Sequence, residues 1–152
     1  LVARRHAAIV LMHMQGTPAT MQQNPTYSDV TAEVSRFLLA RLHAAEQAGI
    51  DPARVMLDPG IGFGKTEEHN LQLLRDLRVL AGLGRPILIG TSRKGFIGRI
   101  TGEAAAADRL FGTAATVAWS IAHGAAMVRV HDVEPMARVV RMIRSIQKND
   151  AV

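Results

Sequence analysis

The stretch RVMLDPGIGFGKT, residues 54–66, decides the fold. It begins with a short, largely apolar run that ends in Asp58, and a loop with three glycines follows before a helical pattern starts at Thr66. A strand with one face in water alternates apolar and polar residues, so an unbroken apolar run indicates burial on both faces, as in a parallel sheet. The stretch therefore predicts one strand–loop–helix unit of an α/β fold.

The same order of features occurs four times along the chain. The β-rich runs lie at 8–13, 54–58, 86–91 and 126–131. Helical patterns are expected at about 28–48, 66–82, 104–123 and 135–147, with Thr66 as an N-cap and Gly112 as a soft point in the third. Each interval between runs has room for a crossover helix, which predicts four parallel βα units.

The length of 152 residues is typical of one domain. Four units could form a small open sheet or half of a (β/α)₈ TIM barrel, which needs roughly 250 residues when complete. The chain begins at Leu1, in what has the pattern of a helix end. We therefore expect residues 1–152 to be a single-domain fragment: the C-terminal half of the barrel, strands five to eight, with parallel strands and flanking helices.

Composition excludes several classes of protein. Hydrophobic residues make up 48%, charged residues 20%, and cysteine is absent, which argues against disorder and against a disulfide scaffold. No apolar run approaches the roughly 18 residues of a membrane span, and no leader pattern is visible. We expect a cytoplasmic protein without a membrane partner.

The charge balance points to small anionic ligands. The net charge is +5, but the basic residues are dispersed and only 4% of the chain is aromatic. Binding of single-stranded nucleic acid needs aromatic stacking platforms, so we expect no nucleic-acid partner. The six histidines show no HxH or HExxH spacing, which argues against a metal site built by this chain.

Polar residues gather where the predicted strands end. The four ends read MHMQG (12–16), DPGIGFGK (58–65), GTSRKGF (90–96) and RVHD (129–132). Ligands of parallel α/β folds bind at these ends, so the pattern favours a binding site. For single residues the alternatives stay open: Asp58 could cap a turn, and His13 and Gln15 could have core or turn roles.

The glycine-rich loop imitates two nucleotide-binding motifs without matching either. A Walker A loop would need its first glycine at Pro59, and a dinucleotide fingerprint would need its third glycine at Lys65. Both fail by one position. The glycines are better explained as allowing close approach of the backbone to a flat ligand.

Four longer segments together resemble the dihydropteroate synthase family. They are LMHMQGTPATMQ (11–22), LDPGIGFGKTEEHNLQLL (57–74), GTSRKGFIG (90–98) and RVHDV (129–133). The resemblance implies a pterin-binding (β/α)₈ barrel that condenses 6-hydroxymethyl-7,8-dihydropterin diphosphate with p-aminobenzoate to 7,8-dihydropteroate and diphosphate in folate biosynthesis. It also implies a Mg²⁺ requirement, with the protein ligand outside this chain, a homodimer, and sulfonamides as mimics of aminobenzoate.

The resemblance also assigns roles to single residues. Asp58 would grip the pterin amino and ring N–H groups, Lys94 would reach the pterin and border the aminobenzoate, and Arg129 would stack on the pterin near the diphosphate. His131 would bind the diphosphate. The expected substrate-binding set is Met12, Asp58, Gly62, Phe63, Ser92, Lys94, Arg129 and His131, of which Lys94, Arg129 and His131 are the expected catalytic residues.

Two alternatives remain at this point. A related pterin-barrel methyltransferase would act on methyltetrahydrofolate with a corrinoid partner, but it has no need of the basic groups after the third and fourth strands. The other alternative is a non-catalytic fragment, and we expect the chain by itself to be inactive because part of the pocket lies outside it.

Overall fold

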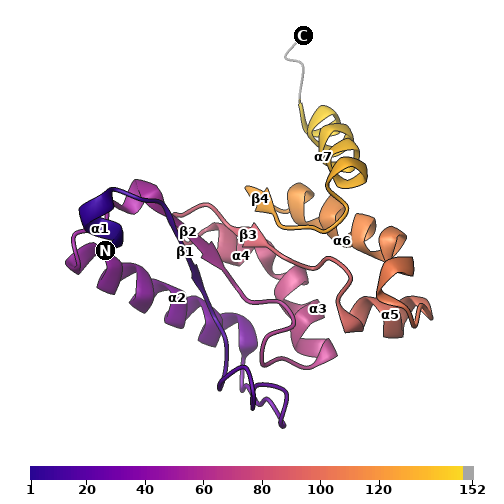
Figure 1. Ribbon diagram of the computed structural model, residues 1–152, viewed down its shortest axis with the longest axis horizontal. Coiled ribbons are helices and arrows are strands. Elements are labelled where there is room, and N and C mark those ends of the chain that lie inside the picture. The colour runs from indigo at the N-terminus through magenta and orange to yellow at the C-terminus, as the bar shows by residue number, and fades with distance from the viewer. Residues whose placement is uncertain (149–152) are drawn as a thin grey trace.

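The computed structural model describes residues 1–148 and consists of short parallel strands with helices packed around them (Figure 1). The strands are β1 (Ile9–Met12), β2 (Val55–Asp58), β3 (Leu88–Ile89) and β4 (Met127–Val128). The α-helices are α1 (Val2–Arg5), α2 (Val30–Gln47), α3 (Glu67–Arg75), α4 (Leu77–Ala81), α5 (Gly95–Thr101), α6 (Leu110–Ala122) and α7 (Val133–Gln147). Short 3₁₀ helices cover Pro52–Arg54 and Ala106–Asp108. Among residues 1–148, no helix combines the length and apolar content that crossing a bilayer requires.

The strands follow one another in chain order across the sheet. β1 pairs with β2 from Ile9↔Val55 to Met12↔Asp58, and β3 pairs with β4 through Leu88↔Met127 and Ile89↔Val128. Both pairs are parallel, and a single parallel bridge between Leu57 and Ile87 joins them. The prediction of a parallel α/β fold built from βα units is confirmed.

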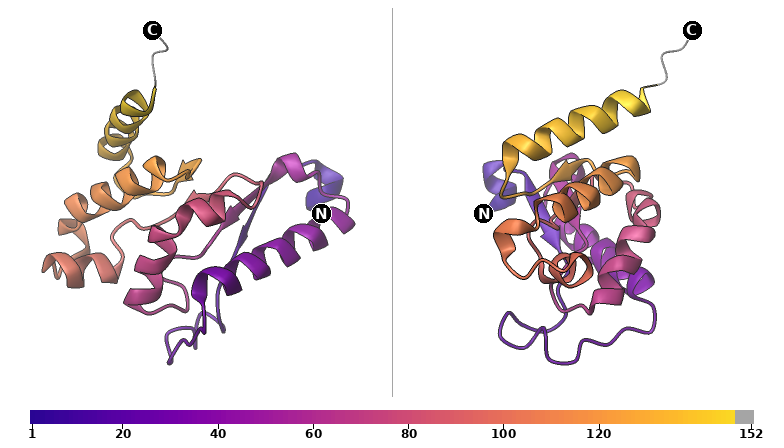
Figure 2. Two further views of the ribbon diagram at one scale, coloured as in Figure 1. Left: turned by 180° about the vertical axis from the view of Figure 1, so that it is seen from behind. Right: turned by 90° about the vertical axis from the view of Figure 1, so that its right-hand side faces the viewer.

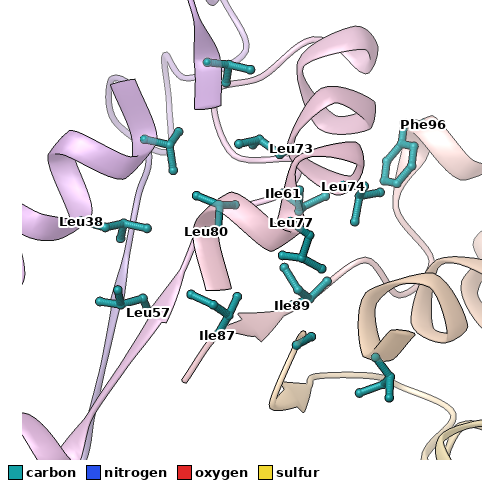
Figure 3. Packing of buried hydrophobic residues seen from close by; sticks show 14 of the residues in the cluster. Leu38, Leu57, Ile61, Leu73, Leu74, Leu77, Leu80, Ile87, Ile89 and Phe96 are labelled. Atoms are coloured by element: carbon teal, nitrogen blue, oxygen red, sulfur yellow. The ribbon is translucent and has the colours of Figure 1, made fainter. Parts of the chain in front are cut away.

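The core lies between the strands and the helices α2, α3 and α4 (Figure 3). Val30, Val34 and Leu38 recur every fourth residue and bury one face of α2, as expected for an amphipathic helix. Leu73 of α3 and Leu77 and Leu80 of α4 are also buried. They belong to the same core cluster as Leu57, Ile87 and Ile89 of the sheet region. This packing fixes where the strands end, and so where the polar loops begin.

Two predicted helix starts have side-chain caps. Asp29 Oδ1 accepts from the Ala32 N–H at 3.1 Å at the start of α2. Thr66 Oγ1 accepts from the His69 N–H at 3.2 Å at the start of α3, and His69 Nδ1 accepts from the Thr66 N–H. These contacts satisfy backbone donors that have no partner inside the helix, and they confirm Thr66 as an N-cap.

The prediction of a single helix at 66–82 is wrong. The structure has two helices there, α3 and α4, separated at Asp76, whose φ of −90° and ψ of 15° leave the helical region. Asp76 Oδ2 accepts a hydrogen bond of 2.7 Å from Thr31 Oγ1 of α2. A contact between elements 45 residues apart thus fixes the break, and no local pattern shows it.

The region after β3 also differs from expectation. The sequence patterns did not indicate the helix α5 at Gly95–Thr101. They placed the start of the third helix at about 104, whereas α6 begins at Leu110. The guanidinium of Arg109 donates to the carbonyl oxygens of Glu103, Ala104 and Arg93, which holds Glu103 and Ala104 outside a helix, and a 3₁₀ helix at Ala106–Asp108 follows before α6. The strands at 86–91 and 126–131 are also shorter than predicted, and α7 begins two residues before Pro135.

The outline of the molecule is elongated, with α7 packed on α6 and projecting away from the sheet (Figure 2). α2 lies along the other end of the molecule, beside β1 (Figure 1).

Candidate active site

The site lies where the strands end. Phe63, Gly90, Ser92, Lys94, Arg129, Val130 and His131 line a cavity of about 410 Å³. They come from the loops after β2, β3 and β4, and Asp58, the last residue of β2, reaches the same place through its contact with Arg129. Four of the predicted residues, Asp58, Lys94, Arg129 and His131, are therefore brought together at one end of the sheet.

Asp58 is a buried carboxylate surrounded by donors and cations. Its side chain is 5% exposed, Oδ1 accepts from the Gly60 N–H at 2.7 Å, and Oδ2 lies 3.9 Å from Arg129 Nη2. Burial raises the pKa of Asp58, whereas the Gly60 N–H and the charges of Arg129, Lys94 and Lys65 lower it. One hydrogen bond and one long ion pair leave acceptor positions on both oxygens for a ligand.

Lys94 crosses the site from the start of α5. Its Nζ donates to the Ile61 carbonyl and lies 4.2 Å from the centre of the Phe63 ring. Burial lowers the pKa of Lys94 to about 8, an effect that Asp58 opposes and Arg129 reinforces. A Cβ at Gly62, whose φ is +78°, would stand 2.8 Å from Lys94 Cδ, so the path of this side chain requires glycine there.

Arg129 and His131 form the basic wall of the cavity. Gly90 makes room for Arg129, because a Cβ at Gly90 would stand 3.2 Å from Arg129 Nη2. Ser92 Oγ accepts from the His131 N–H at 3.2 Å and lies 3.0 Å from His131 Nδ1. Ser92 therefore occupies Nδ1 in either tautomer, and Nε2 is the ring nitrogen left to meet a ligand.

A second cavity of about 250 Å³ adjoins the first and shares Phe63 and Lys94 with it. The remaining residues of its wall are Gln22, Gly62, Lys65, Asn70, Gly95, Phe96 and Arg99. Gln22 Nε2 donates to the Gly62 carbonyl at 2.8 Å, which brings the segment after β1 over this cavity. Met12 is paired with Asp58 in the sheet, but within residues 1–148 it is not part of either cavity wall.

Sequence reasoning missed an ion pair that connects two of the loops. Arg93 donates to Asp132 through Nε (3.1 Å to Oδ2) and Nη2 (2.6 Å to Oδ1). Arg93 has a φ of +60°, a left-handed conformation that is costly for a side chain with a Cβ. The pair fixes Lys94 relative to His131, since each is next in sequence to one of its members.

Sequence reasoning also undervalued Lys65, which it considered only as the end of a motif that fails. Lys65 is 3% exposed, and its Nζ lies 2.9 Å from Nδ1 of the buried His13. A lysine after a glycine-rich loop is usually solvated. The local sequence carries no signal for this contact, because the two partners are 52 residues apart.

The comparisons of this chain with known families, sequences and solved structures agree with one another. Residues 1–131 match the family described as pterin binding enzymes. A dihydropteroate synthase of Neisseria meningitidis is 49% identical over 98% of this chain and 54% of its own length. The dihydropteroate synthase of Xanthomonas albilineans, solved in complex with 7,8-dihydropteroate, is 44% identical with a TM-score of 0.88 over 99% of this chain and 53% of its own.

A third relative is the dihydropteroate synthase of Yersinia pestis in a sulfonamide drug complex, 35% identical with a TM-score of 0.92, over 95% of this chain and 52% of its own. The chain thus spans about half the length of the relatives it matches. The family match covers most of the chain, and the sequence and structural relatives agree with it. The chain therefore belongs to the family of pterin binding enzymes.

Proposed function

We propose that this chain is part of a dihydropteroate synthase, which condenses 6-hydroxymethyl-7,8-dihydropterin diphosphate with p-aminobenzoate. The observation that carries the proposal is the meeting of one buried carboxylate, Asp58, with three basic side chains, Lys94, Arg129 and His131, at the strand ends. A pterin offers parallel N–H donors and its diphosphate offers negative charge, and this set complements both. The names of the relatives support the same activity.

We further propose that residues 1–152 form the pterin-binding domain's C-terminal half, strands five to eight of a (β/α)₈ barrel. Four parallel strands in chain order and a match to about half of each relative support this arrangement. The last four residues of this range lie outside the described part of the chain. By itself the half has only one wall of the pocket, so the chain alone should be inactive.

In the proposed complex, Asp58 binds the pterin edge. An ionised carboxylate has two acceptor oxygens, and the 2-amino and ring N–H groups of a pterin present two parallel donors, so bidentate pairing fits. The Gly60 N–H donates to Oδ1 and restricts the rotation of the carboxylate. Met12, the residue paired with Asp58, would pack under the ring.

The basic wall acts on the leaving group. The arylamine nitrogen forms the new bond to the exocyclic methylene carbon as the bond from that carbon to the diphosphate oxygen breaks, and the amine loses a proton. Arg129 would stack on the pterin and, with His131 Nε2, bind the departing diphosphate. Preorganised donors of this kind lower the barrier because they meet the charge that develops in the transition state.

The adjoining cavity suits the second substrate. Phe63 and Lys94 line both cavities, which supports a pose with the aminobenzoate next to the pterin's reacting carbon. Gly62 and Ser92 contribute to the walls of this paired site. We propose that sulfonamides, as mimics of aminobenzoate, occupy the same cavity, a proposal that the sulfonamide complex of the Yersinia pestis relative supports.

Among residues 1–148 there is no group of three or more His, Asp or Glu side chains arranged to hold a metal ion, and Asp58 faces Arg129. We propose that the Mg²⁺ implied by the resemblance is held by residues outside this chain, because Asp58, the buried carboxylate at the site, already faces Arg129 and the Gly60 N–H. We also propose a homodimer, supported by exposed apolar side chains on α6 and α7: Phe111, Trp119, Val133, Met142 and Ile146.

The test is Asp58→Asn in the full-length protein that contains this chain. The amide keeps an acceptor for the Gly60 N–H but turns an NH₂ group toward the pterin donors, so pterin affinity should fall about tenfold to a hundredfold, the value of one charge-assisted hydrogen bond. Calorimetry with 7,8-dihydropteroate measures the affinity, and a coupled assay with both substrates and Mg²⁺ measures turnover.

The matched control is Asp108→Asn, which neutralises an exposed carboxylate on the 3₁₀ helix before α6 and should change neither quantity. If the wild-type protein forms no dihydropteroate from the two substrates, the proposed activity is wrong. Methyl transfer from methyltetrahydrofolate would then identify the alternative, the pterin-barrel methyltransferase.

A further inference from the structure

Lys65 is the most deeply buried cation near the site, and no step proposed above uses it. Its side chain is 3% exposed although it follows a glycine-rich loop. Its ammonium group has three protons and lies within hydrogen-bond distance of three acceptors: His13 Nδ1 at 2.9 Å, the Gly60 carbonyl at 3.0 Å and the Phe63 carbonyl at 3.0 Å. Every donor of the ammonium therefore meets a protein acceptor.

The three acceptors belong to two different segments. His13 directly follows β1 and extends its pairing, because the His13 N–H donates to the Asp58 carbonyl at 3.0 Å. Gly60 and Phe63 belong to the loop after β2. The two segments touch closely, since a Cβ at Gly60, whose φ is +70°, would stand 1.8 Å from the His13 carbonyl oxygen.

The loop that Lys65 contacts holds one proposed substrate-binding residue, Asp58 at the end of β2, and contains another, Phe63. The Gly60 N–H holds Asp58 Oδ1, and the Phe63 ring lies under Lys94 Nζ. A shift of this loop would therefore move the pterin-binding carboxylate and the shared wall of both cavities together. A displacement of about 1 Å at a reacting site is enough to cost a large factor in rate.

Burying a lysine is costly, which argues that its contacts matter. Burial lowers the pKa of Lys65 to about 7, and the pKa of His13 falls to about 4 through burial first and the charge of Lys65 second. The low pKa of His13 keeps its imidazole neutral, and only a neutral imidazole can accept from an ammonium. An apolar residue of the same length would fill the space without this cost but would leave the two loop carbonyls and His13 unpartnered.

We propose that Lys65 is a positioning residue for the proposed synthase site: its ammonium group ties the loop of residues 59–64 to the end of β1 and so holds Asp58 and Phe63 in place. The inference rests on the proposed function for its consequence in binding. The tether itself is a property of the loop and is measured independently of any substrate.

The experiment compares wild-type and Lys65→Met full-length protein by amide hydrogen exchange and by calorimetry with 7,8-dihydropteroate. Three amides report on the loop: Gly60 bonded to Asp58 Oδ1, Gly62 to Asn70 Oδ1, and Phe63 to the Gly60 carbonyl. In the variant these amides should exchange at least about tenfold faster, and pterin affinity should fall on the order of tenfold to a hundredfold. Leu38→Ala, a core variant on α2, serves as the control for general destabilisation and should leave the affinity unchanged.

A milder pair of substitutions keeps the test decisive if Lys65→Met does not fold. His13→Gln retains an acceptor for the ammonium and should preserve loop protection and affinity, whereas His13→Leu removes the acceptor and should lose both in part. Unchanged exchange of the loop amides in Lys65→Met and His13→Leu overturns the proposal, and so does faster exchange with unchanged affinity. Absence of pterin binding by the wild-type protein contradicts the proposed function instead, and the exchange rates still decide the tether.

Discussion

At the scale of single residues, the neutral state of the buried His13 makes the stability of the protein depend on pH. The residue is 6% exposed, and the pKa of its imidazole falls from 6.5 to about 4 because burial penalises the charged ring and the Lys65 ammonium repels it. The unfolded chain therefore binds more protons than the folded protein between these two values, so stability should rise as pH increases from 4 to 6.5.

We predict that His13 alone makes the free energy of unfolding smaller by up to roughly 3 kcal/mol at pH 4 than at pH 6.5. Urea denaturation at several pH values measures this slope. Asp58, whose pKa is raised, contributes in the opposite direction, so the His13 term is read as the difference between wild type and His13→Gln. Identical slopes in the two proteins would show that the pKa of His13 is the same in the folded and unfolded states and would contradict the prediction.

The same residues show what a sequence can and cannot reveal about a site. That Asp58 and His131 lie at the same end of the sheet could be predicted because one ends β2 and the other follows β4, and strand ends of parallel sheets meet. Lys65 and His13 could not be paired, nor Arg93 with Asp132, because those contacts join residues 52 and 39 positions apart and follow from how loops pack. Met12 shows the converse: it ends β1 beside Asp58, yet within residues 1–148 it lines neither cavity and has no contact like the one between Asp58 and Arg129.

At the scale of elements, strand and helix order followed from hydrophobic patterns, but helix boundaries followed from tertiary contacts. The α2 boundaries match expectation because Asp29 caps the first turn within the helix's own sequence. The break between α3 and α4 depends on Thr31, and α5 packs on α6, a contact that the chain makes only when folded. Local patterns therefore sufficed for both ends of α2 and for the start of α3 at its Thr66 cap.

Gly112 was expected to weaken α6, and the structure gives it a packing role instead. A Cβ at this position would stand 2.3 Å from Ile97 Cγ2 of α5. Glycine inside a helix is usually about 1 kcal/mol less favourable than alanine. Here α5 lies so close to α6 that replacing Gly112 with alanine should destabilise the protein instead of stabilising it.

We therefore predict that Gly112→Ala lowers the free energy of unfolding by about 1–3 kcal/mol, as overpacking does in other cores. Chemical denaturation measures it. The double variant with Ile97→Ala should lose less than the sum of the two single variants, because removing the Ile97 side chain relieves the clash. A stability gain from Gly112→Ala would mean that α5 and α6 are not in this contact.

At the scale of the whole molecule, the sheet has two strands with a free side. Within residues 1–148, β1 pairs only with β2 and β4 only with β3. Val10 on β1 is 46% exposed and Met127 on β4 is 48% exposed, and both line an apolar hollow of about 240 Å³ at the sheet. Unpaired strand edges beside apolar surface favour association with other chains.

We predict that the isolated 152-residue chain self-associates, measured as a concentration-dependent mass by light scattering. Val10→Lys and Met127→Lys should lower the associated mass, because lysine on an edge strand discourages edge-to-edge pairing. Val79→Lys is the matched control: Val79 is exposed on α4, away from the strand edges, and should leave the mass unchanged. An isolated chain that stays monomeric would contradict the prediction.

The same substitutions separate an open sheet from half of a barrel. If the chain is the C-terminal half of a closed barrel, the rest of the protein pairs with β1 and β4 and covers the hollow beside Val10. Val10→Lys should then improve the solubility of the isolated chain but destabilise the full-length protein by several kcal/mol, since it buries an unpaired charge. In a protein whose sheet remains open at β1, the substitution would be harmless in the isolated chain and in the full-length protein. The change that Val10→Lys causes in the free energy of unfolding of the full-length protein therefore distinguishes the two architectures.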